Sequence, residues 1–565
     1  MQRSAFALRP RLLVQFGVVL TILVTLWLTF DSSSKPPSPL SIPSSVPSSP
    51  SLSRSPPILL KGRPRNLRSS RENTSSSPWR LSKPKEELEP CEKIFLFTFV
   101  PWWGFASEFI LYIRAKSMAD KLGYTFLPDD KAWNYGRLSS YFEPMTLSCV
   151  PPADWDDYRK AYPIHQGQSW RFDKKGRPRK RLRYSRAFLS NLDDWTRETY
   201  FVGNSTVQSE LETLRRNDER HRETRDRWIL EEGGTLPSVF EGIFQEHADA
   251  VRDTWTINAE LRDDVNDLEI KTGMSEPRRF EGIKVGRGPV IGLHIRLGDK
   301  ATEYVHDAEE MGISNKFGNL TVYVEAAHDA YRRLVSTDYP SLSDSSSRRF
   351  SPLAQPTLLV MTAEPGVAAR LAEIPLAEPF RIVQTPMPLL DSTATDTKDG
   401  SKRLKDLEVE RNQAGGKDAR PKAYAGKGLS EYEPIPLNNS TDLRDGYTQS
   451  TFNSKSLEER VEHTRAFVRD LALLTSESVD ALVVSGASNI GRLAMLIGGS
   501  DAVVGPRDSL GRALGGKIRS IDAHWYPTSY PSSVYTRYTD VEDLENAAFL
   551  PEEQLRRGKK KQKDN

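Results

Sequence analysis

The stretch VIGLHIRLGDK, residues 290–300, decides how this chain is interpreted. Its first four residues are apolar, and polar or charged side chains follow at His294, Arg296, Asp299 and Lys300. A short apolar run predicts a buried strand, and alternation along that strand puts His294 and Arg296 on one face. Ligands of open parallel sheets bind beyond the carboxyl ends of the strands, so we predict a binding site at the end of this run.

Two later apolar runs end in the same way. LLVMTAEPG (358–366) ends in Thr362 and Glu364, and ALVVSGASNIGRLAMLIGG (481–499) passes through SGASN into a helical pattern. Arginine side chains fork onto phosphate oxygens, and serine hydroxyls with the amides at a helix start complete an anion site. Three such strand ends predict a nucleotide-phosphate site. The alternative for any single residue is a structural role, such as a histidine beside a salt bridge.

A second α/β block precedes these runs. The apolar run CEKIFLFTFV starts at Cys91, a turn at Gly104 leads into a helical pattern, and YTFLP follows. The order strand, glycine turn, helix, strand is typical of a parallel α/β layer. We therefore predict an N-terminal α/β domain over 91–285, with a helical segment, and a Rossmann-like domain over 286–530. Polar stretches near 341–351 and 391–450 predict disordered surface insertions.

The N-terminus predicts a membrane anchor. Residues 12–30 are an apolar run of the length that a helix needs to cross a bilayer, and Arg3, Arg9 and Arg11 precede it. This predicts a cytoplasmic tail over 1–11 and a lumenal remainder; a cleaved signal peptide is the rival interpretation. A Ser/Pro-rich start predicts a disordered stalk over 31–90, and residues 531–565 predict a tail.

Cysteines and sequons bear on the same topology. Cys91 and Cys149 are the two cysteines of the chain, and they either form a disulfide across a long loop or remain as buried thiols. N-x-S/T sequons are typical of a chain that meets the glycosylation machinery. They lie at Asn73, Asn204, Asn319, Asn438 and Asn439.

The charge pattern excludes a strong global field. The net charge is +3 from 79 basic and 76 acidic residues, which does not favour nucleic-acid binding. The local run KKGRPRKRLRYSR (174–186) is interpreted as a solvated loop, with an anionic acceptor or a membrane surface as alternatives. The acidic run DWDD (154–157) is likewise interpreted as a solvated loop and not as a metal site.

The run HIRLGDK resembles the His-x-Arg motif of the GDP-fucose-dependent fucosyltransferase superfamily, and it is closest to α1,6-fucosyltransferase-like proteins. Further stretches resemble this family in the same order, in scattered motifs over residues 91–530. They include the segment from GFASEF to SSYF, VMTAEP and LALLTSESVDALVVSGASNIGRLA. The resemblance implies an α/β fold of the GT-B glycosyltransferase class, with two Rossmann-like domains behind the transmembrane helix and the stalk.

The resemblance also implies roles for single residues. Arg296 matches the arginine that grips the β-phosphate of GDP-fucose, and His294 matches its nucleotide-contacting neighbour. Asp470 matches the carboxylate that reads the guanine edge. Glu303 is the expected catalytic base, and Lys300 is its partner in relaying the proton. The other expected donor-binding residues are Asp299, Ser488, Asn489 and Arg492.

These roles imply a fucosyltransferase of the secretory pathway. The family inverts the anomeric centre without a metal, so we expect no metal and no cofactor besides the donor substrate. The expected acceptor is a glycan or glycoprotein. The expected location is the Golgi membrane, as a single-pass type II protein with a lumenal catalytic part and no nucleic-acid partner.

Two departures from the family keep alternatives open. Leu297 stands where the family has a second arginine, and Glu303 lies one residue nearer the motif than the family's glutamate. The alternatives are a transferase of this fold that uses another nucleotide sugar, and an inactive membrane-tethered glycan-binding protein. The acceptor, the linkage and the oligomeric state are left open by the sequence.

Overall fold

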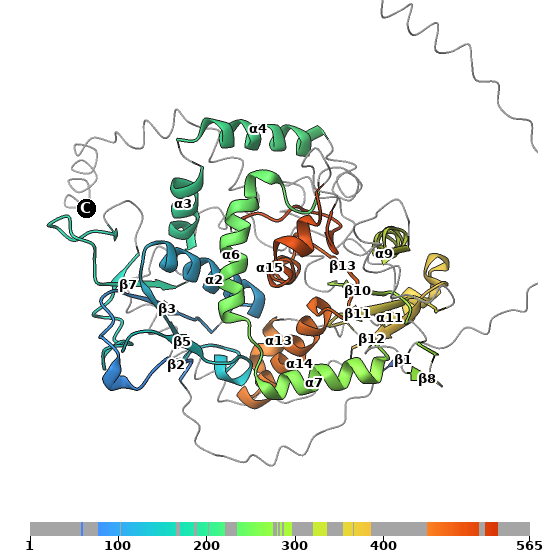
Figure 1. Cartoon of the computed structure of the whole chain (residues 1–565), viewed down its shortest axis with the longest axis horizontal. Coiled ribbons are helices and arrows are strands. Elements are labelled where there is room, and N and C mark those ends of the chain that lie inside the picture. The colour runs from blue at the N-terminus through green and yellow to red at the C-terminus, as the bar shows by residue number, and fades with distance from the viewer. Residues whose placement is uncertain are drawn as a thin grey trace, which may run out of the picture. The chain divides into compact units, whose positions relative to one another are not determined.

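The computed structural model describes the central part of the chain (Figure 1). All described residues belong to one compact unit, Pro56–Asn565. The predicted cytoplasmic tail, membrane anchor and C-terminal tail lie outside them, and no helix within them has the length and apolar character of a bilayer crossing. The described ranges are 58–59, 77–101, 103–164, 170–185, 189–201, 203–220, 234–274, 279–280, 283–284, 287–296, 320–335, 354–364, 366–385, 449–507 and 515–528.

The described residues form a mixed α/β structure whose larger sheet has six parallel strands. Their spatial order is β1 (Ile58–Leu59), β12 (Arg381–Gln384), β11 (Thr357–Met361), β10 (Val290–His294), β13 (Ala481–Val484) and β14 (Ile518–Ser520). Strands β10, β11 and β13 are buried along their whole length. This explains their unbroken apolar runs, because a parallel sheet is covered on both faces.

The order of the strands reverses between β10 and β13. From β10 the chain moves outward to β11 and β12, and it later returns to build β13 and β14 on the other side of β10. The connections after β10 and β13 therefore leave in opposite directions, and ligands of open parallel sheets typically bind beyond the carboxyl ends of strands at such a reversal. The fold places the end of the HIRLGDK strand at this reversal.

Helices cover both faces of the larger sheet. On one face, α9 (Leu320–Val335) and α11 (Val367–Glu373) pack with Ile291 and Leu293 in one apolar cluster. On the other face, α14 (Leu457–Thr475) packs directly on β10. A Cβ atom at Gly292 would lie 2.7 Å from Cδ2 of Leu474, so the close approach of α14 favours glycine there.

The smaller sheet has four parallel strands. Their order is β4 (Thr125–Asp129), β3 (Ile94–Thr98), β7 (Arg181–Ser185) and β6 (Tyr162–Pro163). Helix α2 (Phe105–Lys121) connects β3 to β4, as the strand, glycine turn, helix and strand pattern predicts. Most residues of α2 are buried, because neighbouring helices cover the surface that faces away from the sheet.

A layer of helices joins the two sheets. Helix α2 packs against α6 (Glu241–Thr254), and both pack against α15 (Asn489–Val504), as Figure 1 shows. One apolar core runs from Phe95 in the smaller sheet to Leu482 in the larger sheet. The strands of the two sheets fall in the two predicted domains, apart from β1, and the domains share this core.

The predicted stalk over 31–90 extends too far along the chain. Strand β2 (Trp79–Leu81) pairs with β5 (Met145–Leu147), and β1 joins the larger sheet. The Trp79 ring meets the Trp155 ring edge-on, with centroids 4.4 Å apart. Trp79 and Leu81 supply apolar surface that the preceding Ser/Pro repeat lacks, so the ordered fold begins before Cys91.

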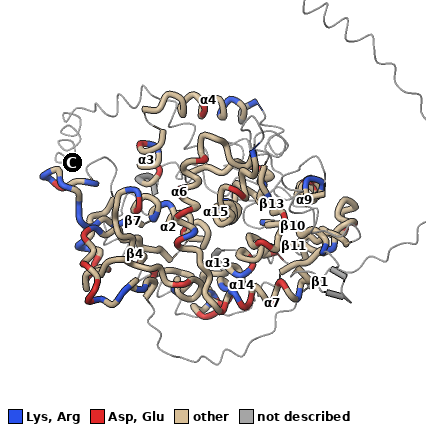
Figure 2. The backbone as a smooth tube through the Cα atoms, viewed as in Figure 1, with Lys and Arg blue, Asp and Glu red and all other residues tan. Residues whose placement is uncertain are grey.

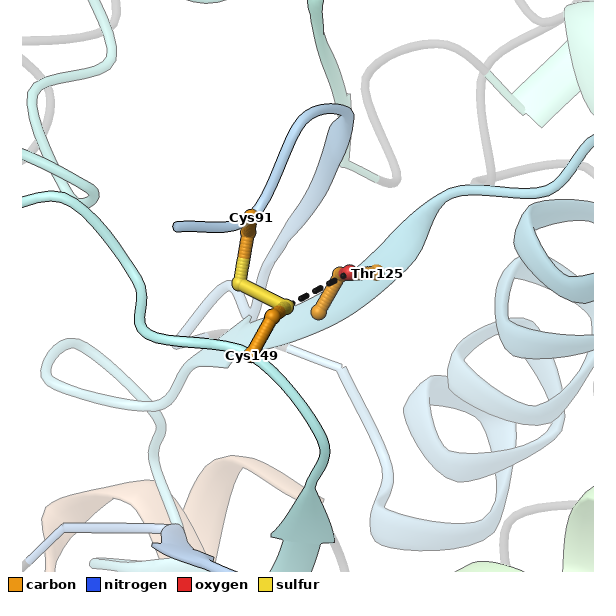
Figure 3. The surroundings of a disulfide bond; sticks show 3 residues. All are labelled: Cys91, Thr125 and Cys149. Carbon is orange, nitrogen blue, oxygen red and sulfur yellow. Dashed lines mark hydrogen bonds between the residues drawn. A yellow bond between two sulfur atoms is a disulfide. The ribbon is translucent and has the colours of Figure 1, made fainter. Parts of the chain in front are cut away.

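Cys91 and Cys149 form a disulfide bond (Figure 3). Their Cα atoms are 5.0 Å apart, and the Thr125 hydroxyl lies 3.2 Å from the Cys149 sulfur. The pairing ties the entry of β3 to the segment after β5. It closes a loop whose ends are 58 residues apart in the sequence.

The remaining elements connect these sheets. The charged middle of the chain is helical, as predicted, whereas 341–351 and 391–448 lie outside the described residues. The other helices are α3 (Leu189–Tyr200), α4 (Ser205–Arg220), α7 (Ala259–Thr272) and α13 (Gln449–Ser454), with 3-10 turns η1 (Lys85–Glu87), η2 (Leu138–Ser140), η7 (Ser238–Phe240) and η9 (Pro375–Ala377). Strands β8 (Arg279–Phe280) and β9 (Ile283–Lys284) form an antiparallel hairpin.

Candidate functional site

The carboxyl end of β10 carries two of the predicted site residues. His294 is its last residue, and Arg296 follows after Ile295, whose amide donates to the Met361 carbonyl at 3.0 Å. The Ile295 side chain is buried in the core, while Arg296 is half-buried. The strand thus brings an imidazole and a guanidinium to the sheet edge at the reversal point.

His294 is buried and electrically neutral. Its Nδ1 atom has no hydrogen-bond partner in the described part of the chain. Burial lowers the pKa of the imidazole to about 3, and the nearby Arg296 charge contributes to that decrease. His294 therefore stays unprotonated at neutral pH and has a ring nitrogen available for a ligand.

The end of β11 carries a buried carboxyl group. Thr362 and Glu364 are both buried, and the Thr362 hydroxyl donates to Glu364 Oε2 at 2.5 Å. The Glu364 amide in turn donates to Thr362 Oγ1 at 3.2 Å. These two bonds fold the segment after β11 into a compact turn beside the end of β10.

The turn after β13 is held by the chain itself. The Ser485 hydroxyl donates to Asp522 Oδ2 at 2.5 Å, and the Ala487 amide donates to Asp522 Oδ1 at 3.2 Å. The Gly486 amide donates to the Ser520 hydroxyl at 3.0 Å. Two amides that the sequence pattern assigned to a phosphate are therefore already occupied by residues at the end of β14.

Asp522 is the residue that the sequence analysis missed. Burial raises the pKa of its carboxyl group, and the hydrogen bonds from Ser485 and Ala487 oppose part of that rise. It also raises the pKa of the Tyr323 phenol, whose own burial is the larger cause. Asp522 comes two residues after the end of β14, within the stretch SIDAHW (520–525). The available signal in the sequence was an apolar residue followed by a carboxylate and a histidine, Asp522 and His524.

Three other predicted donor-binding residues lie at the start of α15. Ser488 caps α15 by accepting from the Ile490 amide at 3.3 Å, and Asn489 Nδ2 donates to the Ser107 hydroxyl at 2.6 Å. Arg492 donates to the Thr528 carbonyl at 2.9 Å, and its guanidinium lies 4.2 Å from the Tyr526 ring centroid. These contacts give each of the three side chains a partner within the fold.

The glycines of the same turn also serve internal packing. A Cβ atom at Gly486 would lie 2.1 Å from the Ala523 carbonyl oxygen, and one at Gly491 would lie 2.0 Å from the Ser485 carbonyl oxygen. Small residues in a turn before a helix can also make room for a phosphate. In the structure they let the α15 start and the β14 end approach the turn.

Gly491→Ala is expected to lower the free energy of unfolding by about 1–3 kcal/mol, because the added methyl overlaps a backbone carbonyl. The matched control is Gly242→Ala in α6, where an added Cβ meets no atom within 4 Å. That change should alter stability by no more than about 1 kcal/mol. Chemical denaturation of both variants checks this, and equal stability of the two would contradict the packing argument.

Asp470 lies two strands from β10. It is buried on α14, Arg469 Nη2 lies 2.6 Å from its Oδ1 atom, and the Thr385 side chain forms a further hydrogen bond with the carboxylate. Burial raises the pKa of this carboxyl, and the Arg469 charge and the Thr385 side chain oppose that rise. Thr385 follows β12, so Asp470 lies near the carboxyl end of that strand.

Some of the predicted site residues and sequons lie outside the part of the chain that the structure describes. Asp299, Lys300 and Glu303 are not described, and neither are the sequons at Asn73, Asn319, Asn438 and Asn439. The sequon at Asn204 is exposed, and its side chain accepts from the Val207 amide at 3.2 Å at the start of α4. Within the described ranges, no group of His, Cys, Asp and Glu side chains could hold a metal ion.

No protein-family model and no curated protein matches this chain.

Proposed function

We propose that this chain is an inverting glycosyltransferase of the GT-B type that transfers fucose from GDP-fucose to a glycan or glycoprotein. One observation carries the proposal: His294 and Arg296 lie at the reversal point of a parallel sheet, and the buried carboxylate of Asp470 lies two strands away, beside Thr385. The resemblance of the HIRLGDK stretch to the GDP-fucose-dependent family assigns the donor diphosphate and the donor base to these same residues.

The end of β10 suits the diphosphate. A guanidinium presents planar donors that match phosphate oxygens, and it stays charged at any physiological pH. His294 is neutral, so its ring adds a hydrogen-bonding group without placing a second buried charge beside Arg296. The pair therefore supports binding of an anionic group at the point where the strand order reverses.

Asp470 suits a guanine base. Guanine presents adjacent N1–H and N2–H donors, which a carboxylate can accept together. Uracil presents one N–H between two carbonyl oxygens, and those oxygens would repel a carboxylate. Burial gives the Asp470 carboxylate a desolvation cost that Thr385 and Arg469 offset only in part, and two guanine donors would offset more of it. The side-chain chemistry thus favours GDP over UDP.

The proposed reaction is a single displacement. An acceptor hydroxyl attacks the anomeric carbon of fucose from the face opposite the diphosphate, the bond from that carbon to the diphosphate oxygen breaks, and GDP leaves with the electron pair. The hydroxyl proton passes to a general base, for which Glu303 with Lys300 as relay is our proposal. Arg296 stabilises the negative charge that develops on the departing diphosphate.

The proposed location is the Golgi lumen. Residues 12–30 have the composition of a type II anchor, and the disulfide between Cys91 and Cys149 supports an oxidising compartment for the folded part. Glycan and glycoprotein acceptors occur in that compartment.

A second candidate function is glycan binding without transfer. It is favoured by the turn after β13, where Ser520 and Asp522 already occupy the amides of Gly486 and Ala487. In that case the chain keeps the fold of a transferase and lacks a working donor site. Binding of GDP separates the two candidates.

GDP is expected to raise the melting temperature of the full-length chain, whereas UDP is not. At one hundred times its dissociation constant, a bound ligand stabilises a protein by about 2.7 kcal/mol. Asp470→Asn should abolish the GDP effect, because an amide cannot accept both guanine donors. A thermal-shift series with GDP, UDP and CMP measures this.

The matched control for Asp470→Asn is Asp480→Asn. Asp480 also pairs with an arginine, Arg287, at 2.5 Å, but it precedes β13 at the opposite edge of the sheet. The control should lower stability and keep the GDP effect. Equal shifts with GDP and UDP in the unmodified chain would refute the donor assignment.

A further inference from the structure

A second, strongly charged surface lies on the smaller sheet. Between residues 154 and 183 the sequence has ten Lys or Arg and four Asp, a net charge of +6. Most of these cations lie on residues 171–180 and on β7, which follows directly. We call this segment, residues 171–185, the basic patch. Figure 2 shows Lys and Arg gathered around β7.

Strand β7 alternates between the core and this surface. Leu182 and Tyr184 are fully buried, whereas Arg181 and Arg183 are half-buried on the opposite face. Residues two apart on a strand are separated by about 7 Å, so the two guanidinium groups stand in a row. The row continues into the exposed loop that carries Lys174 and Lys175.

Two arginines of the patch are held against tyrosine rings. Arg179 lies over the Tyr162 ring, with its Cζ atom 3.4 Å from the centroid, and Arg183 lies 5.2 Å from the centroid of Tyr158. The Tyr158 side chain is 60% exposed. Stacking orients a guanidinium without neutralising it, so its donors remain directed at what lies outside.

Several cations of the basic patch have no carboxylate partner among the described residues. Asp154 is used by Arg181 and Lys160, and the hydrogen bond from Arg181 is the main cause that lowers its pKa to about 2. Arg183 has no described ion-pair partner, and burial lowers its pKa. The cations without a described ion pair are Lys174, Lys175, Arg179, Lys180 and Arg183.

A half-buried cation without a counter-ion is energetically unfavourable, and an external anion relieves that cost. The Nε atoms of Arg179 and Arg183 are buried without a hydrogen-bond partner in the described chain, so the fold itself does not saturate these two guanidinium groups. A ligand with several anionic groups along one line would satisfy the row on β7 and the lysines of the adjoining loop together.

We propose that the basic patch is a docking surface for an acidic glycan that carries sulfate or carboxylate groups. Arginine pairs well with these planar or multi-oxygen anions, and a sugar ring can pack beside the exposed Tyr158. The disulfide in the same sheet region favours a compartment where acidic glycans, and not nucleic acids, are the available polyanions. This inference does not depend on the nucleotide-sugar proposal.

Heparin, a sulfated glycan, is the probe. The full-length chain should bind heparin with an affinity that falls as salt increases, because the contacts are ionic. The double variant Arg179→Gln with Arg183→Gln should weaken binding roughly tenfold or more, since charge-assisted hydrogen bonds are lost. Lys174→Gln with Lys175→Gln, two exposed loop positions, tests the same surface without altering packed residues.

The matched control removes two charges elsewhere. Arg252→Gln on α6 with Lys271→Gln on α7 has the same change in net charge, and it should leave heparin affinity within about twofold. If both patch variants bound heparin as the control does, the docking surface would not exist. Tighter binding of an RNA oligonucleotide than of heparin would also overturn the proposal. The GDP thermal shift should persist in the patch variants, so failure of the donor proposal and of this one can be told apart.

Discussion

Arg296→Ala is expected to reduce fucose transfer from GDP-fucose about 100- to 1,000-fold, the loss seen when one transition-state donor is removed. Arg296 stands at the end of β10, where the sheet order reverses, and no backbone group can replace its charge on the departing diphosphate. GDP release and product formation, each measured with saturating donor, should fall together. The melting temperature should change little, because the side chain is half-buried and outside the apolar core.

Two further variants separate charge from geometry. Arg296→Lys keeps one positive charge but loses the forked donors, so it should recover part of the lost rate. Arg381→Ala removes an arginine from the amino end of β12, where it donates to the Thr272 carbonyl at 2.7 Å. That control should keep normal turnover per folded molecule. If Arg296→Ala released GDP as fast as the unmodified chain, the catalytic proposal would fail.

The second large effect concerns the disulfide. Replacing Cys91 and Cys149 together by serine is expected to lower the free energy of unfolding by about 4 kcal/mol, because the bond closes a long loop in the unfolded chain. The sequence separation of 58 residues sets this magnitude. Denaturant titrations of the two proteins measure the difference.

The control keeps the bond and changes its surroundings. Thr125→Val removes the hydroxyl that lies 3.2 Å from the Cys149 sulfur while leaving the loop closed. It should cost no more than about 1.5 kcal/mol, the net value of one hydrogen bond. A serine variant as stable as the unmodified chain would show that the loop contributes nothing to stability.

Several parts of the fold could be predicted from local sequence. The runs that became β10, β11 and β13 are apolar because both faces of a parallel sheet are covered, and such runs are visible without a structure. The position of His294 and Arg296 at a strand end follows from the same pattern. The stalk boundary was wrong because the two apolar side chains Trp79 and Leu81 find their partners about 65 residues later, in β5 and near Trp155.

The candidate site was harder to predict than the fold. Ser488, Asn489 and Arg492 have the residue types of an anion site, yet their partners are the Ile490 amide, Ser107 and Thr528. Ser107 is 382 positions away from Asn489 in the sequence. The spacing of residues in a motif shows which side chains are close together in the sequence. It does not show which residues from distant parts of the chain form hydrogen bonds with them.

The sequence by itself determined the strands β3, β4, β10, β11 and β13 and the strand end that carries His294 and Arg296, since periodicity and burial are properties of a short segment. The interpretation of 174–186 as a solvated loop was wrong for Arg181–Ser185, which form β7 inside the smaller sheet. Only the tertiary structure decided that Asp522 closes the turn after β13, that Asp470 lies buried beside Thr385 near the end of β12, and that Cys91 is bonded to Cys149. The physical reason is that hydrogen bonds and burial are decided by neighbours in space, and helix crossovers bring those neighbours from far along the chain.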